Sequence, residues 1–85
     1  MSKSLKNCRE QIDAVDEQLL KLVNERAKLA REIGSLKQDG PIYRPEREAQ
    51  VLRRLMENNA GPLSSEAVTA IFRSVMSNCR ALEKE

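Results

Sequence analysis

The chain has 85 residues, and about half of them are Ala, Glu, Lys, Leu or Arg, the types that dominate long helices. One Tyr, one Phe, no Trp and three Gly leave too few aromatic residues and turn signals for a β-sandwich or barrel. No apolar run approaches a membrane span, and no hydrophobic signal core is visible, so we expect a soluble, cytoplasmic, all-α protein. The formal charge of +2 is too balanced for a nucleic-acid binder unless the basic residues cluster.

Histidine is absent, and the two cysteines, Cys8 and Cys79, have no metal-ligand spacing. These two features exclude a zinc site and histidine-based catalysis. We expect both cysteines to be reduced thiols on helix faces. The alternative is a structural disulfide, which a reducing cytosol disfavours.

Two Gly-Pro breakers, at residues 40–41 and 61–62, divide the sequence into three segments. Pro45 suits the first turn of a helix, and Ser64 is a good N-cap. We expect one all-α domain over residues 1–85. Its predicted helices cover about residues 4–38, 45–59 and 64–84.

The first segment carries a heptad pattern in which every seam position except one is apolar or Cys. The two rows of the seam are Leu5, Ile12, Leu19, Arg26 and Ile33, and Cys8, Val15, Leu22, Leu29 and Leu36. Such a helix spans roughly 50 Å at 1.5 Å per residue, more than the two shorter helices can cover. We therefore expect a second copy to bury the seam in an obligate homodimer; a monomeric hairpin with a frayed long helix is the alternative.

Arg26 is the exception in the seam, and a guanidinium that faces a core is costly unless an anion or hydrogen-bond acceptors meet it. It therefore indicates an anion site, although an internal Arg-Glu pair or a register device would also explain it. Lys37 lies almost three turns further along the same face, so both side chains could reach one small anion. The helix dipole alone would also explain a lysine there.

Arg9 is about 42 Å from Lys37 along the same helix, so it cannot reach the same ligand within one chain. In an antiparallel dimer, Arg9 of one copy approaches the middle of the other, and the site is shared. Arg47 lies above an apolar stripe in the second helix, where a solvated rim charge is the alternative. In the third helix, Glu83 lies one turn from Cys79 and is badly placed for the helix dipole, so a site residue and an ordinary surface acid are both possible.

The third helix has an apolar face that we expect to point inward. Its predicted members are Val68, Ile71, Phe72, Val75, Cys79 and Leu82.

Four motifs, taken in order and spacing, resemble the all-helical (AroQ-class) chorismate mutases, above all the N-terminal mutase domain of bifunctional chorismate mutase-prephenate dehydratases. The resemblance covers nearly the whole chain. The motifs run from Cys8 to Leu20, from Asn24 to Arg26, from Ile33 to Lys37 and from Tyr43 to Glu48.

The resemblance implies an intertwined homodimer of three-helix chains with two shared active sites. It implies substrate-binding roles for Arg9 across the dimer, for Arg26, Lys37, Arg47 and Glu48, and for Cys79 and Glu83 of the third helix. Cys79 and Glu83 stand where the best-known bacterial pattern has serine and glutamine, and Arg44 stands where it has aspartate. A thiol is only a weak donor, which puts one substrate hydrogen bond in doubt.

The implied reaction rearranges chorismate to prephenate in aromatic amino acid (phenylalanine and tyrosine) biosynthesis, with no cofactor and no metal. Catalysis would come from holding a reactive conformer and stabilising charge on the ether oxygen. We assign catalytic roles to Lys37, Glu83 and Arg26. Because Glu83 can donate to the ether oxygen only when protonated, we expect activity to fall as pH rises.

Two other functions remain open at this stage. An isochorismate pyruvate lyase of the same fold would use much of the same anion clamp. A non-enzymatic helical dimerisation module would explain the seam and the surface charge, but not Arg26. The sequence predicts no nucleic-acid or membrane partner.

Overall fold

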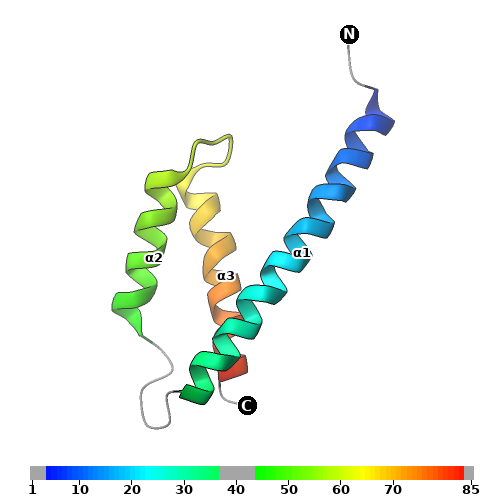
Figure 1. Cartoon of the computed structure of the whole chain (residues 1–85). Helices are drawn as coiled ribbons and strands as arrows, with labels where there is room; N and C mark the ends of the chain where they lie inside the picture. Colours follow the sequence, from blue (N-terminus) through cyan, green and yellow to red (C-terminus); the bar gives the residue numbers. More distant parts are fainter. Residues whose placement is uncertain (1–3, 37–43, 84–85) are drawn as a thin grey trace.

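The computed structural model describes residues 4–36 and 44–83, and these residues form three helices and no strand. The helices are α1 (Leu5–Leu36), α2 (Pro45–Asn58) and α3 (Ser65–Glu83) (Figure 1). The all-α expectation is confirmed for the described residues, and the three helix starts and the end of α2 lie within one residue of those expected. Residue 84, where the third helix was expected to end, lies outside the described residues. Residues 37 and 38, where the first helix was expected to end, lie outside the described residues.

Local hydrogen bonds explain where the helices begin. The Ser4 hydroxyl accepts a hydrogen bond from the Asn7 backbone N–H at 3.1 Å, and Ser64 accepts one from the Ala67 N–H at 3.1 Å. Both are N-caps that satisfy an orphan donor of the first turn. Helix α2 begins with Pro45 instead, since a proline at this position loses no helical hydrogen bond.

The turn between α2 and α3 is held by one side chain. The Asn59 side-chain amide donates to the Leu63 carbonyl at 2.7 Å, and its oxygen accepts from the Gly61 N–H at 3.0 Å. Gly61 has a φ of +81°, a conformation that glycine adopts without steric cost. This turn sets α3 back alongside α2.

Helix α3 packs against both other helices, antiparallel to α2 and parallel to α1 (Figure 1). The core between α2 and α3 consists of Val51, Leu52 and Met76, with Leu55 and Phe72 packed against it. Ile71 was expected on the inward face of α3, but it is 48% exposed, and Met76 is buried at 4% instead. The other expected members of this face are buried, as Val68 and Cys79 are, or half-buried, so the expected face is wrong only at Ile71 and lacks Met76.

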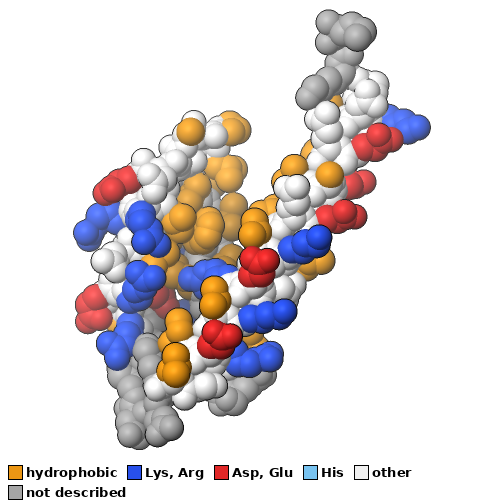
Figure 2. Space-filling view, in the orientation of Figure 1, with side chains coloured by type: hydrophobic (Ala, Val, Ile, Leu, Met, Phe, Trp, Pro, Cys, Tyr) orange, Lys and Arg blue, Asp and Glu red, His pale blue; other side chains and the backbone are white. Residues whose placement is uncertain are grey.

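Helix α1 extends far past the other two, so that its N-terminal half stands alone (Figure 1). Figure 2 shows hydrophobic side chains along α1 and on the surfaces of α2 and α3 that face it. All eight large apolar residues of the predicted seam are 43% to 82% exposed in the single chain. Among the described residues, no helix is both long and apolar enough to cross a membrane.

Candidate active site

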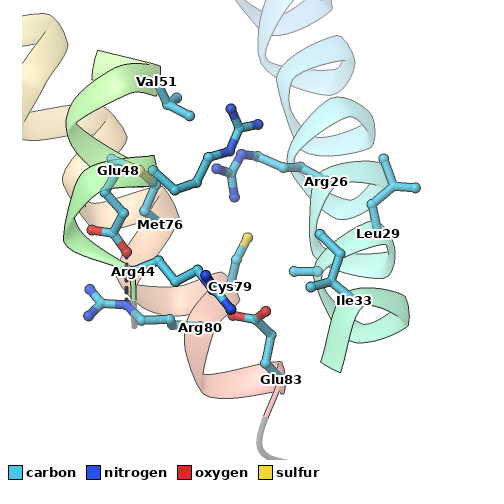
Figure 3. Close-up of a pocket in the computed structure, with 12 residues that line it drawn as sticks. Arg26, Leu29, Ile33, Arg44, Glu48, Val51, Met76, Cys79, Arg80 and Glu83 are labelled. Carbon is cyan, nitrogen blue, oxygen red and sulfur yellow. Dashed lines mark ion pairs between the residues drawn. The ribbon is translucent and has the colours of Figure 1, made fainter. Parts of the chain in front are cut away.

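A cavity of about 640 Å³ lies where the three helices converge (Figure 3). Its size is within the range of about 300–1,000 Å³ that is usual for small-molecule sites. All three helices and the residue that precedes α2 contribute to its walls. The described lining residues are Arg26, Leu29, Ala30, Ile33, Arg44, Arg47, Glu48, Val51, Met76, Cys79, Arg80 and Glu83.

The bottom of the cavity is apolar. Val51, Met76 and Cys79 are 8%, 4% and 5% exposed, and Ala30 of α1 is buried beside them. Val51 and Met76 belong to the core between α2 and α3, so the cavity floor is part of this core. Charged groups above such a floor interact more strongly than they would in water, because the local dielectric is low.

The walls are predominantly basic. Four arginines and two glutamates are among the described lining residues, which gives this part of the cavity a formal charge of +2. Arg26 projects from α1 into the space between α1 and the other two helices (Figure 3). It is partly buried, and no residue in the described part of the chain forms an ion pair with it. The internal Arg-Glu pair that the sequence left open for Arg26 is therefore not formed within these residues.

Two consecutive residues of α2 reach the cavity and have different partners. The Arg47 guanidinium donates to the side-chain oxygen of Gln50 at 3.1 Å and leaves further donors for a ligand. The Glu48 carboxylate forms an ion pair with Arg80 of α3, with Nε 3.2 Å from Oε2. This pair ties the first turn of α2 to the last turns of α3, directly at the cavity wall.

The C-terminal end of α3 brings Cys79 and Glu83 to the cavity, one turn apart. The Glu83 side chain points into the cavity, and Arg44 extends toward it from the start of α2 (Figure 3). Glu83 reaches this position because α3 passes very close to α1 at Gly34. A Cβ on residue 34 would lie 2.6 Å from the Glu83 carbonyl oxygen, so only glycine fits there.

Most of the site residues expected from the sequence come together in this cavity. They are Arg26, Arg47, Glu48, Cys79 and Glu83. Lys37 lies outside the described residues. Arg9 is not at this cavity, because it lies on the projecting half of α1, roughly 25 Å from Arg26 by helical rise.

Arg80 and Met76 are among the lining residues that the sequence analysis did not identify. An arginine in the last turn of a helix is already explained by the helix dipole, so the position of Arg80 did not indicate a site residue. Met76 is an ordinary apolar residue in the sequence of the third helix, and nothing in its spacing indicates a cavity. Both cysteines are free thiols, as expected, and Cys79 is the buried one.

The cavity and the fold together define a class: a small helical chain with an arginine-lined pocket between its helices. Residues 8–84 match the family model of chorismate mutase type II. The chain therefore belongs to the chorismate mutase type II family.

Several curated relatives are bifunctional chorismate mutase/prephenate dehydratases. The chain is 53% identical over 76 residues to the protein of Neisseria gonorrhoeae, which covers 89% of this chain and 21% of that protein. It is 45% identical to the protein of Stutzerimonas stutzeri, over 94% of this chain and 24% of that one. The chain thus spans less than a quarter of the length of these relatives.

Solved structures of chorismate mutases have a similar fold. Chorismate mutase from Helicobacter pylori in complex with prephenate is 35% identical, with a TM-score of 0.89 over 94% of this chain and 89% of that one. Chorismate mutase (Form II) from Thermus thermophilus is 30% identical, with a TM-score of 0.94 over 98% of this chain and 97% of that chain. The chain thus shares its fold, over nearly its whole length, with these two solved chorismate mutases.

Proposed function

We propose that this chain is a chorismate mutase, which converts chorismate to prephenate in aromatic amino acid biosynthesis. The observation that carries the proposal is Arg26, a partly buried arginine that lines a cavity with no ion-pair partner among the described residues. A guanidinium in such a place is favourable when an anion occupies the cavity. Chorismate is a small dianion, and its two carboxylates match a pocket whose described walls carry a net positive charge.

The rearrangement breaks a C–O bond and forms a C–C bond within one molecule. It therefore depends on holding a reactive conformer and on stabilising the negative charge that develops on the ether oxygen. In our proposal Arg26 and Arg47 hold the carboxylates through charge-assisted hydrogen bonds, for which the planar guanidinium is well suited. The two arginines come from different helices, α1 and α2, so they would also fix the direction of the substrate.

Three further residues complete the proposed machinery within one chain. The Glu48 carboxylate accepts a hydrogen bond from the substrate hydroxyl. Glu83, in its protonated form, donates one to the ether oxygen, and Lys37 contacts both a carboxylate and that oxygen. A donor aimed at developing charge favours the transition state over the ground state, which is the requirement for catalysis.

We also propose that the enzyme is a homodimer with shared active sites. The exposed seam of α1 supports this, because a monomer would leave eight large apolar side chains in contact with water. Their burial against a second copy would be favourable in free energy. A second copy that covers the seam would bring its own Arg9 toward the cavity, which the Arg9 of the same chain does not reach. A cytoplasmic location remains a prediction from the sequence.

The direct test is to supply the purified chain with chorismate and, separately, with isochorismate. We expect chorismate to be consumed and prephenate to be formed at a rate proportional to enzyme concentration. Release of pyruvate from isochorismate without prephenate formation would favour the lyase of the same fold. If the folded protein turns over neither compound, the proposal is refuted. A non-enzymatic helical dimerisation module would then be the favoured function.

A further inference from the structure

The ion pair between Arg80 and Glu48 joins α3 to α2 at the cavity wall. The Arg80 Nε lies 3.2 Å from the Glu48 Oε2, and the two side chains are 28% and 22% exposed. The Nε atom itself is shielded from solvent. Both residues also line the cavity, so this pair borders the site directly (Figure 3).

Stability alone gives a weak reason for this pair. Ion pairs between partly exposed side chains contribute little to the free energy of unfolding, because solvent screens them and both side chains lose entropy. The same geometry has a clear effect on Glu48, however. A glutamate in the first turn of a helix has three rotatable bonds and open solvent within reach, and a guanidinium at one oxygen limits it to a few orientations.

The pair leaves Glu48 able to act on a ligand. A carboxylate has about four lone-pair positions on its two oxygens, so the contact with Nε at Oε2 does not exhaust its capacity to accept. The positive charge of Arg80 also compensates the negative charge of Glu48, which would otherwise repel an anionic substrate. Arg80 therefore reduces the electrostatic repulsion between the Glu48 carboxylate and a bound dianion.

We propose that Arg80 is a positioning residue, which holds the Glu48 carboxylate in the orientation that accepts the substrate hydroxyl. This inference rests on the proposed chorismate mutase function. It assigns a role to a residue of α3 that acts through Glu48 and not on the substrate. A misplacement of about 1 Å at such an acceptor is enough to lower a rate by about a hundredfold.

The test is a double-mutant cycle of kcat/KM with chorismate, built from Arg80→Gln, Glu48→Ala and the double variant. We expect Arg80→Gln to lower kcat/KM by about 10- to 100-fold in the wild-type background. In the Glu48→Ala background the same change is expected to cost less than about twofold, because no carboxylate is left to orient. Arg80→Lys, which keeps the charge, is expected to recover part of the loss.

Arg73→Gln is the matched control, since Arg73 is an exposed arginine of the same helix that does not line the cavity. It is expected to leave kcat/KM unchanged. The midpoint of denaturant unfolding is measured for every variant, and we expect Arg80→Gln to keep it close to the wild-type value. A large drop in the midpoint, with activity loss in step, would mean a structural role and overturn the positioning role.

Two further outcomes separate this inference from the proposed function. An equal loss from Arg80→Gln with and without Glu48 would show that Arg80 contacts the substrate itself, which overturns the positioning role while the enzyme assignment stands. If the wild-type chain, folded, does not turn over chorismate, the proposed function and this inference are both overturned.

Discussion

Gly34 of α1 lies directly against the backbone of Glu83 in α3, so closely that a Cβ on residue 34 would be 2.6 Å from the Glu83 carbonyl oxygen and 2.8 Å from its Cα. Both contacts are with backbone, which cannot rotate away as a side chain can. Gly34 therefore determines how near the C-terminal end of α3 comes to α1, and with it where Glu83 lies in the cavity.

We expect Gly34→Ala to lower the free energy of unfolding by about 1–3 kcal/mol, since overpacking forces the two helices apart. The gain in helix propensity, up to about 1 kcal/mol, offsets only part of this. Activity is expected to fall as well, because Glu83 moves with the backbone. Denaturant unfolding and chorismate turnover measure both effects, with Ser35→Ala as the exposed control on the next residue. A variant as stable and active as wild type would contradict the close approach.

Glu83 itself predicts a pH-dependent activity. A carboxyl group can donate a hydrogen bond to the ether oxygen only while protonated, and the carboxylate repels the developing charge. We therefore expect kcat/KM to decrease as pH rises. In Glu83→Gln the amide donates at every pH, and the profile is expected to flatten.

The pH profile of Glu57→Gln serves as the control, because Glu57 is an exposed glutamate of α2 away from the cavity. It is expected to match that of wild type. If Glu83→Gln keeps the wild-type pH profile, Glu83 is not the donor.

Met76 is the most buried of the described core residues, with 4% of its surface exposed, and it belongs to both the core and the cavity floor. We expect Met76→Ala to lower the free energy of unfolding by about 2–5 kcal/mol, the range for large-to-small changes in a core. Met56→Ala, at a methionine that is 37% exposed, is expected to cost about 1 kcal/mol or less. Protein concentration must be equal in both experiments, because dimerisation would add to stability. Equal costs at the two positions would place the core elsewhere.

Shared active sites predict complementation between two inactive variants. In a heterodimer of Arg9→Ala and Lys37→Ala chains, one site takes Lys37 from the first chain and Arg9 from the second and is intact, while the other site has both defects. When equal amounts of the chains are refolded together at random, about a quarter of the wild-type number of sites is expected to be active. Activity no greater than the average of the separate variants would argue for sites within single chains.

The sequence predicted the local structure well, because local signals determine it. Ser64 and Pro45 mark helix starts, and both start helices in the structure. Arg26 was identifiable as a site residue because it is the one charged residue among the ten seam positions, and the other nine are apolar or Cys. A local break in a regular pattern is typical of functional sites. The place of Arg26 at the cavity wall agrees with this interpretation.

The relation between helices was less accessible from the sequence. Glu48 and Arg80 are 32 positions apart, and their contact depends on how α2 and α3 are placed, which neither helix encodes alone. The inward face of α3 was wrong at Ile71 for a related reason. Ile71 and Met76 lie on different sides of one broad apolar surface, and packing against α2 selects the side with Met76.

The central claim is that Arg26 binds the substrate in the cavity between the three helices. The most direct test is to compare kcat/KM for chorismate between Arg26→Ala, Lys28→Ala and wild type, with helicity measured in parallel. Lys28 is exposed on the same helix and does not line the cavity. We predict that Arg26→Ala keeps its helical fold and loses about 10²- to 10³-fold in kcat/KM, as when a preorganised donor is removed, while Lys28→Ala retains wild-type turnover. A folded Arg26→Ala variant with near-normal turnover would contradict the claim.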